Sequence, residues 1–269
     1  MLSYGSYGCV YHPGTDCNGT TNKTHVSKIV NTKYSAREIT MGNKIKQIPK
    51  YQDYFVPVET SCPIQSNKVK RCRALADETT FTLLTMPYLK QVKVPFDITT
   101  FNTLTNAIEL LIEHSLVHFD IKLDNIICTP KPYLIDFGIS LDMDELNLAA
   151  YFFVYDPQQY SWPIEVHLLC YMIDHNWSEA SLQKVCQEVC QSPIEPLLNK
   201  TVKGYEQECV KHYEYVWKLP RKEVIAKLIE GWRTWDMYAL TLLLMQPHVN
   251  LHYDVTKRLT PAASRFAGP

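Results

Sequence analysis

The spacing of apolar residues differs between the two ends of this 269-residue chain, and this difference limits the folds open to it. Up to residue 88, short β-type runs alternate with turn residues; they lie at 9–11, 25–30 and 80–86. One amphipathic segment between them, 35–48, predicts a single helix that Pro49 ends. The N-terminal part is therefore expected to be a small sheet with one main helix.

After residue 100 the pattern becomes helical. Apolar residues recur at helical spacing over 101–114, and the region 166–269 is mostly of the same kind. Between these, the runs 126–128 and 133–135 flank Thr-Pro-Lys-Pro and predict a hairpin-like pair. Polar stretches at 14–22 and 61–73 predict loops. The fold class expected is α+β, β-rich first and α-rich second.

Charge and hydropathy exclude several classes of protein. A formal net charge of -1 gives no overall attraction to nucleic acid, and no apolar stretch reaches the roughly 18 to 20 residues of a membrane span. The opening Met-Leu-Ser-Tyr-Gly lacks the regions of a signal peptide. We therefore expect a cytoplasmic protein without nucleic-acid or membrane partners; the sequence leaves the oligomeric state open.

Nine cysteines first suggest a disulfide set, but the number is odd and no secretory signal is seen. The expectation is that most are reduced thiols. Cys62 with Cys72, or Cys186 with Cys190, could be proposed as zinc pairs, but neither has C-x2-C spacing and no His pair completes them. Cys9 is read as a small buried apolar residue or, alternatively, as a reactive thiol.

The segment from His118 to Asn125 reads His-Phe-Asp-Ile-Lys-Leu-Asp-Asn, and Asp136-Phe137-Gly138 follows eleven residues after Asn125. Each polar residue alone could be a turn former or helix cap. Together they resemble the catalytic loop and the D-F-G motif of eukaryotic-type protein kinases. The resemblance implies that Asp120 lies near the attacking hydroxyl and that Lys122 neutralises charge on the γ-phosphate. It also implies that Asn125 and Asp136 hold Mg2+.

Upstream, the segment from Ser3 to Val10 resembles the glycine-rich loop of the same family, with Ser3 where the first glycine would stand. A plain β-turn is the alternative. The resemblance implies ATP contacts from one group of residues: Gly5, Ser6, Tyr7, Gly8 and Val10. It also implies that Lys28 holds the α- and β-phosphates and that Glu38, otherwise a surface charge, pairs with it.

Met86-Pro87-Tyr88-Leu89 resembles the hinge that binds adenine, although Pro87 removes one backbone donor. Met86 would then lie at the back of the pocket, and Tyr88 and Leu89 would frame the purine. An ordinary strand end is the alternative.

Three later segments extend the resemblance. They are Trp162-Pro163-Ile164-Glu165, similar to A-P-E, the helix start at 235–240, similar to D-x-W-S-L, and the late arginine motif at 258–261. They imply a buried ion pair of Glu165 with Arg258, and an Asp236 that holds the backbone of the catalytic loop.

The resemblance as a whole implies a bilobal protein kinase-like fold, with an N-lobe over 1–88 and a C-lobe over 89–269 that carries a helical insert at about 166–231. It implies a Ser/Thr protein kinase that uses ATP with Mg2+, or with Mn2+ in its place, on protein substrates. Compact kinases of large DNA viruses look similar, which implies a host-cell cytoplasm or a virion.

Departures from the family pattern also carry expectations. Phe119 stands where many kinases have an arginine that answers a phosphate, and 136–165 contains no Thr. We therefore expect a segment ordered by packing and constitutive activity. Two rival functions stay open: a small-molecule kinase of the aminoglycoside or choline type, against which Lys122 argues, and a pseudokinase that acts as a binding scaffold.

Overall fold

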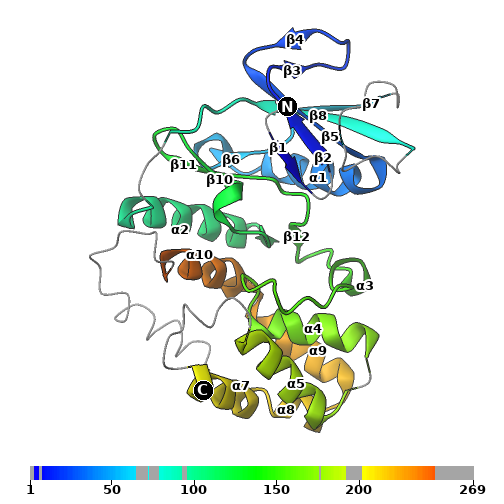
Figure 1. Cartoon of the computed structure of the whole chain (residues 1–269), viewed down its shortest axis with the longest axis vertical. Coiled ribbons are helices and arrows are strands. Elements are labelled where there is room, and N and C mark those ends of the chain that lie inside the picture. The colour runs from blue at the N-terminus through cyan, green and yellow to red at the C-terminus, as the bar shows by residue number, and fades with distance from the viewer. Residues whose placement is uncertain are drawn as a thin grey trace. The chain divides into compact units, whose positions relative to one another are not determined.

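The computed structural model describes residues 3–5, 8–64, 72, 79–92, 96–175, 177–191 and 202–245. The chain forms two compact units, one made of Met1–Val94 with Asp124–Ser140 and the other of Pro95–Leu123 with Leu141–Pro269. Within the described residues, the first unit is rich in strands and has one α-helix, and the second is mostly helical (Figure 1). This agrees with the expected α+β class. That the units are lobes with a boundary at residue 88 stays a prediction.

A five-stranded antiparallel sheet forms the centre of the first unit. Its strands, in spatial order, are β1 (Ser3–Gly5), β2 (Gly8–Tyr11), β5 (His25–Asn31), β8 (Phe81–Pro87) and β7 (Thr60–Ile64). The three predicted β-type runs are thus confirmed. The predicted loop at 61–73 is wrong for its first four residues, which belong to β7. This edge strand is polar and half-exposed, so it lacks the apolar alternation of an internal strand.

The two faces of this sheet carry different side chains. One face holds an apolar cluster of Cys9, Ile29, Cys72, Phe81 and Leu83. The other holds Val30, Leu84 and Met86 and packs against helix α1 (Thr32–Ile45). Because side chains alternate along a strand, Lys28 lies on the α1 face while its neighbours Ser27 and Ile29 lie on the opposite one.

Helix α1 begins three residues earlier than predicted and ends at Ile45, before Pro49. The reason is a cap: the side chain of Asn31, the last residue of β5, accepts a hydrogen bond from the Lys33 backbone N–H. Strand and helix are therefore joined without a loop. This direct join fixes the position of Glu38 relative to Lys28.

A second, three-stranded sheet lies in the same unit. The predicted hairpin is confirmed as β10 (Ile126–Cys128) and β11 (Pro132–Ile135), and β11 also pairs in parallel with β6 (Phe55–Val56), which follows the short 3-10 helix η1 (Tyr51–Asp53). Ile135 packs with Val56 in the apolar cluster beside α1. Asp136 directly follows Ile135, so it is attached to a strand end that is packed in the core.

The predicted loop at 14–22 contains a small hairpin of β3 (Gly14–Thr15) and β4 (Thr21–Asn22), which projects from the large sheet in Figure 1. Two residues per strand are too few to produce a periodic signal in the sequence. The hairpin is held by contacts that are far apart in the chain, described below.

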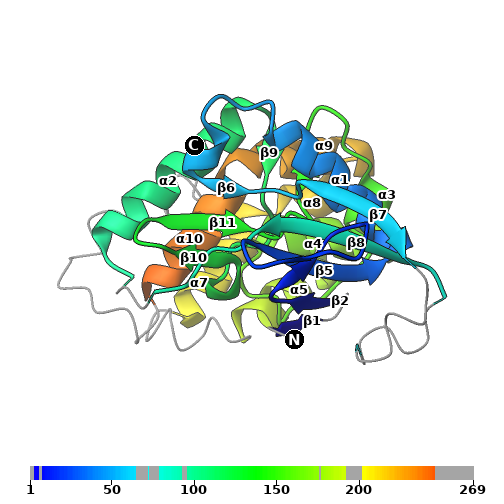
Figure 2. The ribbon, with the colours of Figure 1, turned by 90° about the horizontal axis from the view of Figure 1, so that it is seen from above.

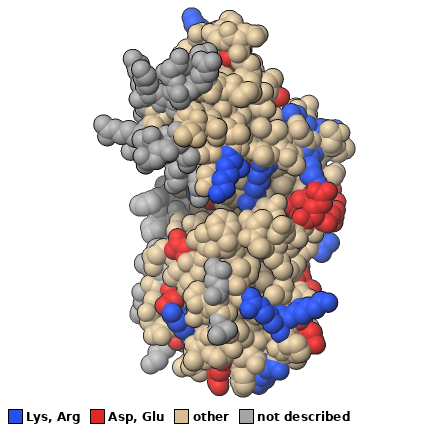
Figure 3. All heavy atoms as spheres, turned by 90° about the vertical axis from the view of Figure 1, so that its right-hand side faces the viewer, with Lys and Arg blue, Asp and Glu red and all other residues tan. Residues whose placement is uncertain are grey.

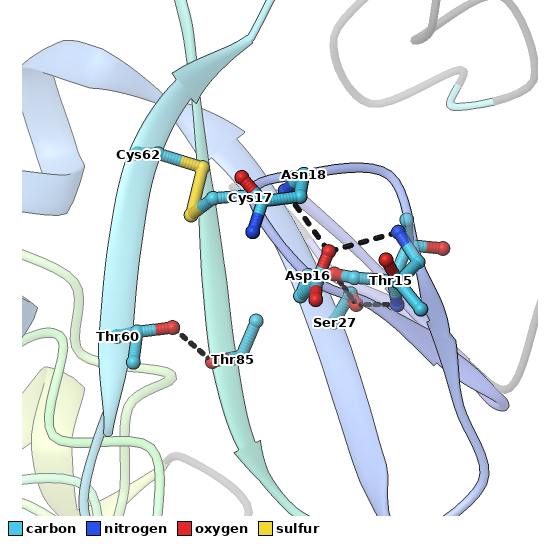
Figure 4. The surroundings of a disulfide bond; sticks show 9 residues. Thr15, Asp16, Cys17, Asn18, Ser27, Thr60, Cys62 and Thr85 are labelled. Atoms are coloured by element: carbon cyan, nitrogen blue, oxygen red, sulfur yellow. Dashed lines mark hydrogen bonds between the residues drawn. A yellow bond between two sulfur atoms is a disulfide. The ribbon is translucent and has the colours of Figure 1, made fainter.

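Four cysteines of the first unit form two disulfides, Cys9–Cys72 and Cys17–Cys62. Figure 4 shows the second of these. The expectation that most of the nine cysteines are reduced thiols agrees with the five that form no disulfide, but these four are paired. Cys62 and Cys72 belong to different bridges. The other five form no disulfide and are buried: Cys128, Cys170, Cys186, Cys190 and Cys209. Within the described residues, no group of three or more His, Cys, Asp or Glu side chains could hold a metal ion. Disulfides are a modest argument for an oxidising compartment.

In the second unit, helix α2 (Ile98–Glu113) is capped by Asp97 and packs against α10 (Trp235–Met245). Short strands β9 (Leu116–Val117) and β12 (Leu141–Asp142) pair beside them. The other helices that the structure describes in this unit are α3 (Leu148–Tyr151), α4 (Ile164–Asp174), α5 (Glu179–Cys190), α7 (Val202–His212), α8 (Tyr215–Lys218), α9 (Arg221–Glu230) and the 3-10 helix η6 (Gly231–Thr234) (Figure 2). The prediction that 166–269 is mostly helical is confirmed for its described residues, and 246–269 lie outside them.

Two surface properties bear on partners. Among the described helices, none combines the length and the apolar character needed to cross a membrane. On the face drawn in Figure 3, basic and acidic side chains both occur, as the near-zero formal charge leads one to expect.

Candidate functional site

Three charged residues meet in the first unit. The Nζ of Lys28 donates to both carboxylate oxygens of Glu38, at 3.0 and 2.9 Å, and to Oδ1 of Asp136 at 2.9 Å. The residues come from β5, from α1 and from the turn after β11, and Lys28 and Asp136 are 108 positions apart in the chain. The structure thus brings together three residues that the sequence analysis singled out. We refer to them as the Lys28 cluster.

Burial sets the electrostatics of the Lys28 cluster. Glu38 is 4% exposed, and loss of solvation raises the pKa of its carboxyl, against which the charge of Lys28 works. Desolvation alone would lower the pKa of the Lys28 amine, but the two carboxylates together raise it above its ordinary value. Lys28 is therefore cationic, and Asp136, with 41% of its side chain exposed, is the member open to solvent.

Local backbone geometry aims the Asp136 carboxylate at Lys28. Asp136 has a positive φ of 62°, a conformation that costs energy for a residue with a Cβ and occurs where the surroundings enforce it. The Gly138 N–H donates to Oδ1 of Asp136 at 3.4 Å. A Cβ added at Gly138 would lie only 3.2 Å from that oxygen. A residue with a side chain at this position would therefore crowd the Asp136 carboxylate, and glycine avoids that contact.

Asn125 ends the 3-10 turn η4 (Leu123–Asn125) directly before β10, and its side chain is buried. Because β10 and β11 are paired, Asn125 and Asp136 stand at the outer ends of one hairpin. Their amide and carboxylate oxygens are hard ligands of the kind Mg2+ prefers.

Arg37 is a residue that the sequence analysis missed. Its guanidinium donates from Nε to the Ser140 carbonyl at 3.1 Å and from one terminal nitrogen to the Ile139 carbonyl. It thereby ties α1 to the chain just after Gly138. The only sequence signal was its place next to Glu38, which could not reveal a backbone partner 103 positions away.

The expected phosphate-binding loop is described in part. Gly5 pairs with Gly8, and Val10 pairs with Lys28 across β2 and β5, which puts Val10 beside the lysine strand. A Cβ at Gly8 would lie 2.2 Å from the Ile29 carbonyl oxygen, so only glycine allows this approach. Ser6 and Tyr7 lie outside the described residues.

The contacts of the expected hinge limit how it could bind adenine, and its adenine-binding role stays a prediction. Met86 is buried in the apolar cluster beside α1, and Leu89 packs against the same cluster. The Tyr88 N–H, however, donates to the Thr24 carbonyl at 2.8 Å, and the Tyr88 ring stacks on His12 with ring centres 3.7 Å apart. With Pro87 lacking an N–H, a purine would have to take its backbone donor from residue 89 or beyond.

In the second unit, Lys122 Nζ donates to Oδ2 of Asp120 at 2.8 Å. Asp120 retains 14% of its side-chain exposure and Lys122 46%, so the pair is open on the lysine side. The two residues are close neighbours in the chain, and their contact follows from the short, bent loop they share.

Asp236 holds this loop by its backbone. Its two carboxylate oxygens accept the N–H groups of His118 and Phe119 at 2.6 and 2.8 Å, which confirms the expectation for Asp236. Burial raises the pKa of the Asp236 carboxyl, and the two N–H donors oppose that shift. Phe119, like Asp136, has a positive φ, here 67°. The residue before Asp120 is thus held in a strained conformation by a buried acceptor.

Phe119 is the centre of an aromatic cluster. It stacks on Trp162 with ring centres 4.8 Å apart and meets Phe152 and Trp235 at 5.8 Å each. The Trp162 indole N–H also donates to the Phe119 carbonyl at 2.9 Å. The described residues between 141 and 165 are therefore attached to the loop by packing, as expected for a chain with phenylalanine at this position. We refer to these four rings as the Phe119 cluster.

Glu165 is buried and accepts a hydrogen bond from the Tyr213 hydroxyl at 2.8 Å. Desolvation raises the pKa of its carboxyl. Tyr213 lies in the predicted insert, and the sequence offered no signal for it. The expected partner, Arg258, lies outside the described residues, so that ion pair stays a prediction. Neither the comparison with protein-family models nor the comparison with curated proteins gives a match.

Proposed function

We propose that this chain is a protein kinase that transfers the γ-phosphate of ATP to Ser or Thr hydroxyls of protein substrates. The Lys28 cluster carries the proposal: a lysine held by a buried carboxylate, and touching a second, solvent-open carboxylate, is suited to bind phosphate oxygens next to a metal ion. Its three members match kinase motifs that are far apart in the sequence, and their meeting in space supports the proposal.

In the proposed reaction, the substrate hydroxyl oxygen attacks the γ-phosphorus, its proton passes to the Asp120 carboxylate, and the bond from phosphorus to the ADP oxygen breaks. Lys122, which already contacts Asp120, would offset negative charge on the transferred group. The Asp236 bonds to the backbone would keep Asp120 oriented through this step. The expected ATP contacts of Gly5, Ser6, Tyr7, Gly8, Val10, Met86, Tyr88 and Leu89 belong to the same proposal.

The donor set near the Lys28 cluster fits a magnesium ion. Mg2+ is commonly bound by one or two protein oxygens together with substrate phosphates, rather than by a complete protein cage. Asp136 and Asn125 would supply those oxygens, and Mn2+ takes similar ligands. When bound, the ion would neutralise phosphate charge. Lys28 could then exchange its contact with Asp136 for one with phosphate.

The Phe119 cluster supports constitutive activity. In many kinases a phosphate bound by an arginine orders this segment; here aromatic packing would order the segment before Glu165 instead. We therefore propose that no activating phosphorylation is needed. Of the two compartments that the resemblance implies, the cytoplasm of a host cell and a virion, the two disulfides favour the virion, because disulfides are rare in the reducing cytosol.

A pseudokinase and a small-molecule kinase are the alternatives. The Tyr88 N–H already donates to the Thr24 carbonyl, so it is not available to adenine. Weaker adenine binding would favour the pseudokinase. The Lys122 contact with Asp120 favours a phosphotransferase that acts on protein.

The deciding experiment incubates the purified chain with Mg2+ and ATP labelled at the γ-phosphate, in parallel with casein, a histone, an aminoglycoside and choline. The proposal predicts label on Ser or Thr of a protein acceptor. Label on a small molecule would assign the alternative enzyme. Bound nucleotide without transfer to any acceptor would favour the pseudokinase.

A further inference from the structure

The two disulfides differ in their access to solvent. Cys9 and Cys72 are 0% and 4% exposed and lie in the apolar cluster on the outer face of the sheet. Cys17 is exposed and Cys62 half-buried. Their Cα separations are alike, 5.8 and 5.9 Å, so access rather than span distinguishes them. A thiol in solution can approach Cys17 but not Cys9.

Cys17 lies in the tip of the β3–β4 hairpin, which is ordered by its own contacts. Oδ1 of Asp16 accepts the N–H groups of Asn18 and Thr20 at 2.9 and 2.8 Å. Figure 4 shows Cys17 reaching from this tip to Cys62 on β7, the edge strand of the sheet. The bridge therefore fastens a preformed hairpin to the far edge of the sheet.

The hairpin is also held by β5. The Ser27 hydroxyl donates to the Thr15 carbonyl at 2.8 Å and accepts the Thr15 N–H at 2.5 Å. A Cβ at Gly14 would lie 2.7 Å from the His25 carbonyl oxygen, which shows how closely β3 approaches this strand. Ser27 directly precedes Lys28. The hairpin thus contacts the lysine strand one residue from the lysine.

We propose that Cys17–Cys62 is a thiol–disulfide exchange site that controls how firmly the β3–β4 hairpin holds β5. When the bridge is closed, the hairpin is fixed at β7 and at Ser27. When it is open, the hairpin keeps its contacts to β5 but loses its attachment to β7; these contacts are the two Ser27 hydrogen bonds, the close backbone approach and the bond between the Asn22 side chain and the His25 ring. Residues 25–31 then become more mobile, while the buried Cys9–Cys72 bridge stays intact.

The exchange needs a dithiol reductant, whether a protein dithiol or a small molecule. One thiolate of the dithiol attacks the exposed Cys17 sulfur, the Cys17–Cys62 bond breaks, and Cys62 leaves as a thiolate. The second thiol of the reductant then attacks the mixed disulfide and releases Cys17. Two electrons pass to the protein, two protons restore the thiols at lower pH, and the reductant becomes a disulfide.

A first experiment maps the thiols. The oxidised chain is treated with increasing dithiothreitol, alkylated with iodoacetamide and analysed by peptide mass spectrometry. Cys17 and Cys62 should be alkylated at reductant concentrations that leave Cys9 and Cys72 paired. Equal reduction of both bridges, earlier reduction of Cys9–Cys72, or alkylation of Cys17 without reductant would overturn the proposal.

A second experiment measures hydrogen exchange of the backbone amides. After selective reduction, and in the Cys17→Ser/Cys62→Ser variant without reductant, amides of residues 25–31 should exchange faster. The matched variant Ser27→Ala keeps the bridge but loses the side-chain contact, so reduction should add little to its exchange. Faster exchange of the hairpin with unchanged exchange of β5 would refute the coupling.

The consequence for nucleotide rests on the proposed function. A fluorescent ATP analogue should bind about fivefold more weakly to the reduced chain. This is the loss of affinity that corresponds to roughly one net hydrogen bond. If the oxidised chain binds no nucleotide, the proposed function fails, and the exchange of residues 25–31 alone still decides the present inference. Equal affinity of both forms would contradict the link to Lys28.

Discussion

The Lys28 cluster and the Phe119 cluster hold their polar groups by opposite means. In the first, the bonds join charged side chains, and one member, Asp136, is open to solvent. In the second, the buried Asp236 carboxylate accepts two backbone N–H groups, and three other aromatic rings surround the strained Phe119. Side-chain ion pairs can exchange partners with an incoming anion or cation, whereas backbone bonds inside an aromatic core cannot without unfolding.

This contrast suggests a division of roles. The Phe119 cluster should act as a fixed support whose loss lowers stability, and the Lys28 cluster as a ligand-responsive group whose loss lowers activity first. The following predictions separate the two, beginning with the largest expected effect on stability.

Phe119→Ala should lower the free energy of unfolding by about 4 kcal/mol, because it removes a buried ring and leaves a cavity among three other aromatic rings. Urea denaturation followed by circular dichroism measures this. Phe153→Ala is the control: that ring is 57% exposed, and its loss should change stability by less than about 0.5 kcal/mol. A Phe119→Ala variant as stable as the control would remove the distinction between support and site.

His167 should make the second unit acid-sensitive. Burial lowers the pKa of its ring to about 4, and neither ring nitrogen has a well-formed hydrogen bond within the described residues. The unfolded chain binds this proton near pH 6.5, so stability is complete above that pH and falls by about 3 kcal/mol as the pH drops toward 4. Denaturation at several pH values should show a slope that His167→Leu lacks and that exposed His175→Asn retains. An unchanged slope in His167→Leu would contradict the assignment.

Glu38→Gln should cost about 2 kcal/mol, less than the usual loss of a buried ion-pair partner, because Lys28 keeps Asp136. Phosphate transfer should nevertheless fall by at least about tenfold, since the lysine loses its anchor. Asp53→Asn, which breaks the exposed pair with Lys131, is the control and should change neither quantity appreciably. If Glu38→Gln lost stability but kept its rate of phosphate transfer, the Lys28 cluster would be a structural support rather than a ligand-responsive group.

Gly138→Ala should change stability by less than about 1 kcal/mol. Its effect should appear in turnover instead, because the new Cβ would press on the Asp136 carboxylate from 3.2 Å. Gly204→Ala is the matched control, since its Cβ would meet nothing within 4 Å. Equal turnover in both variants would show that the position of Asp136 is not critical.

Much of this arrangement could be predicted from sequence, because it is local or marked by residue type. The strands at 9–11 and 25–30, the single helix near 35–48 and the hairpin around 130 each follow from periodicity and turn residues. Motif spacing indicates Lys28, Glu38 and Asp136 as site residues, and the three are in contact in the structure.

The remaining features depend on partners distant in the chain. Cysteine count and the absence of a signal sequence favoured thiols, but pairing is decided by which strands adjoin, and β7 was not recognised as a strand. The Tyr88 N–H donates to the Thr24 carbonyl because β5 and β8 are paired as far as His25 and Pro87, the residues next to them. Residue types alone do not reveal this register. Arg37 and Tyr213 reach their partners through tertiary packing alone.

The measurement that tests the central claim most directly is the rate of phosphate transfer by Asp120→Asn and Asp136→Asn beside the unsubstituted chain. Asp144→Asn, an exposed change in the second unit, and Asp53→Asn in the first serve as controls. The proposal predicts that both controls keep the full rate and that each test variant loses about a thousandfold or more while remaining folded. Transfer that persists in either test variant, or a chain that transfers nothing to any protein acceptor, would contradict it.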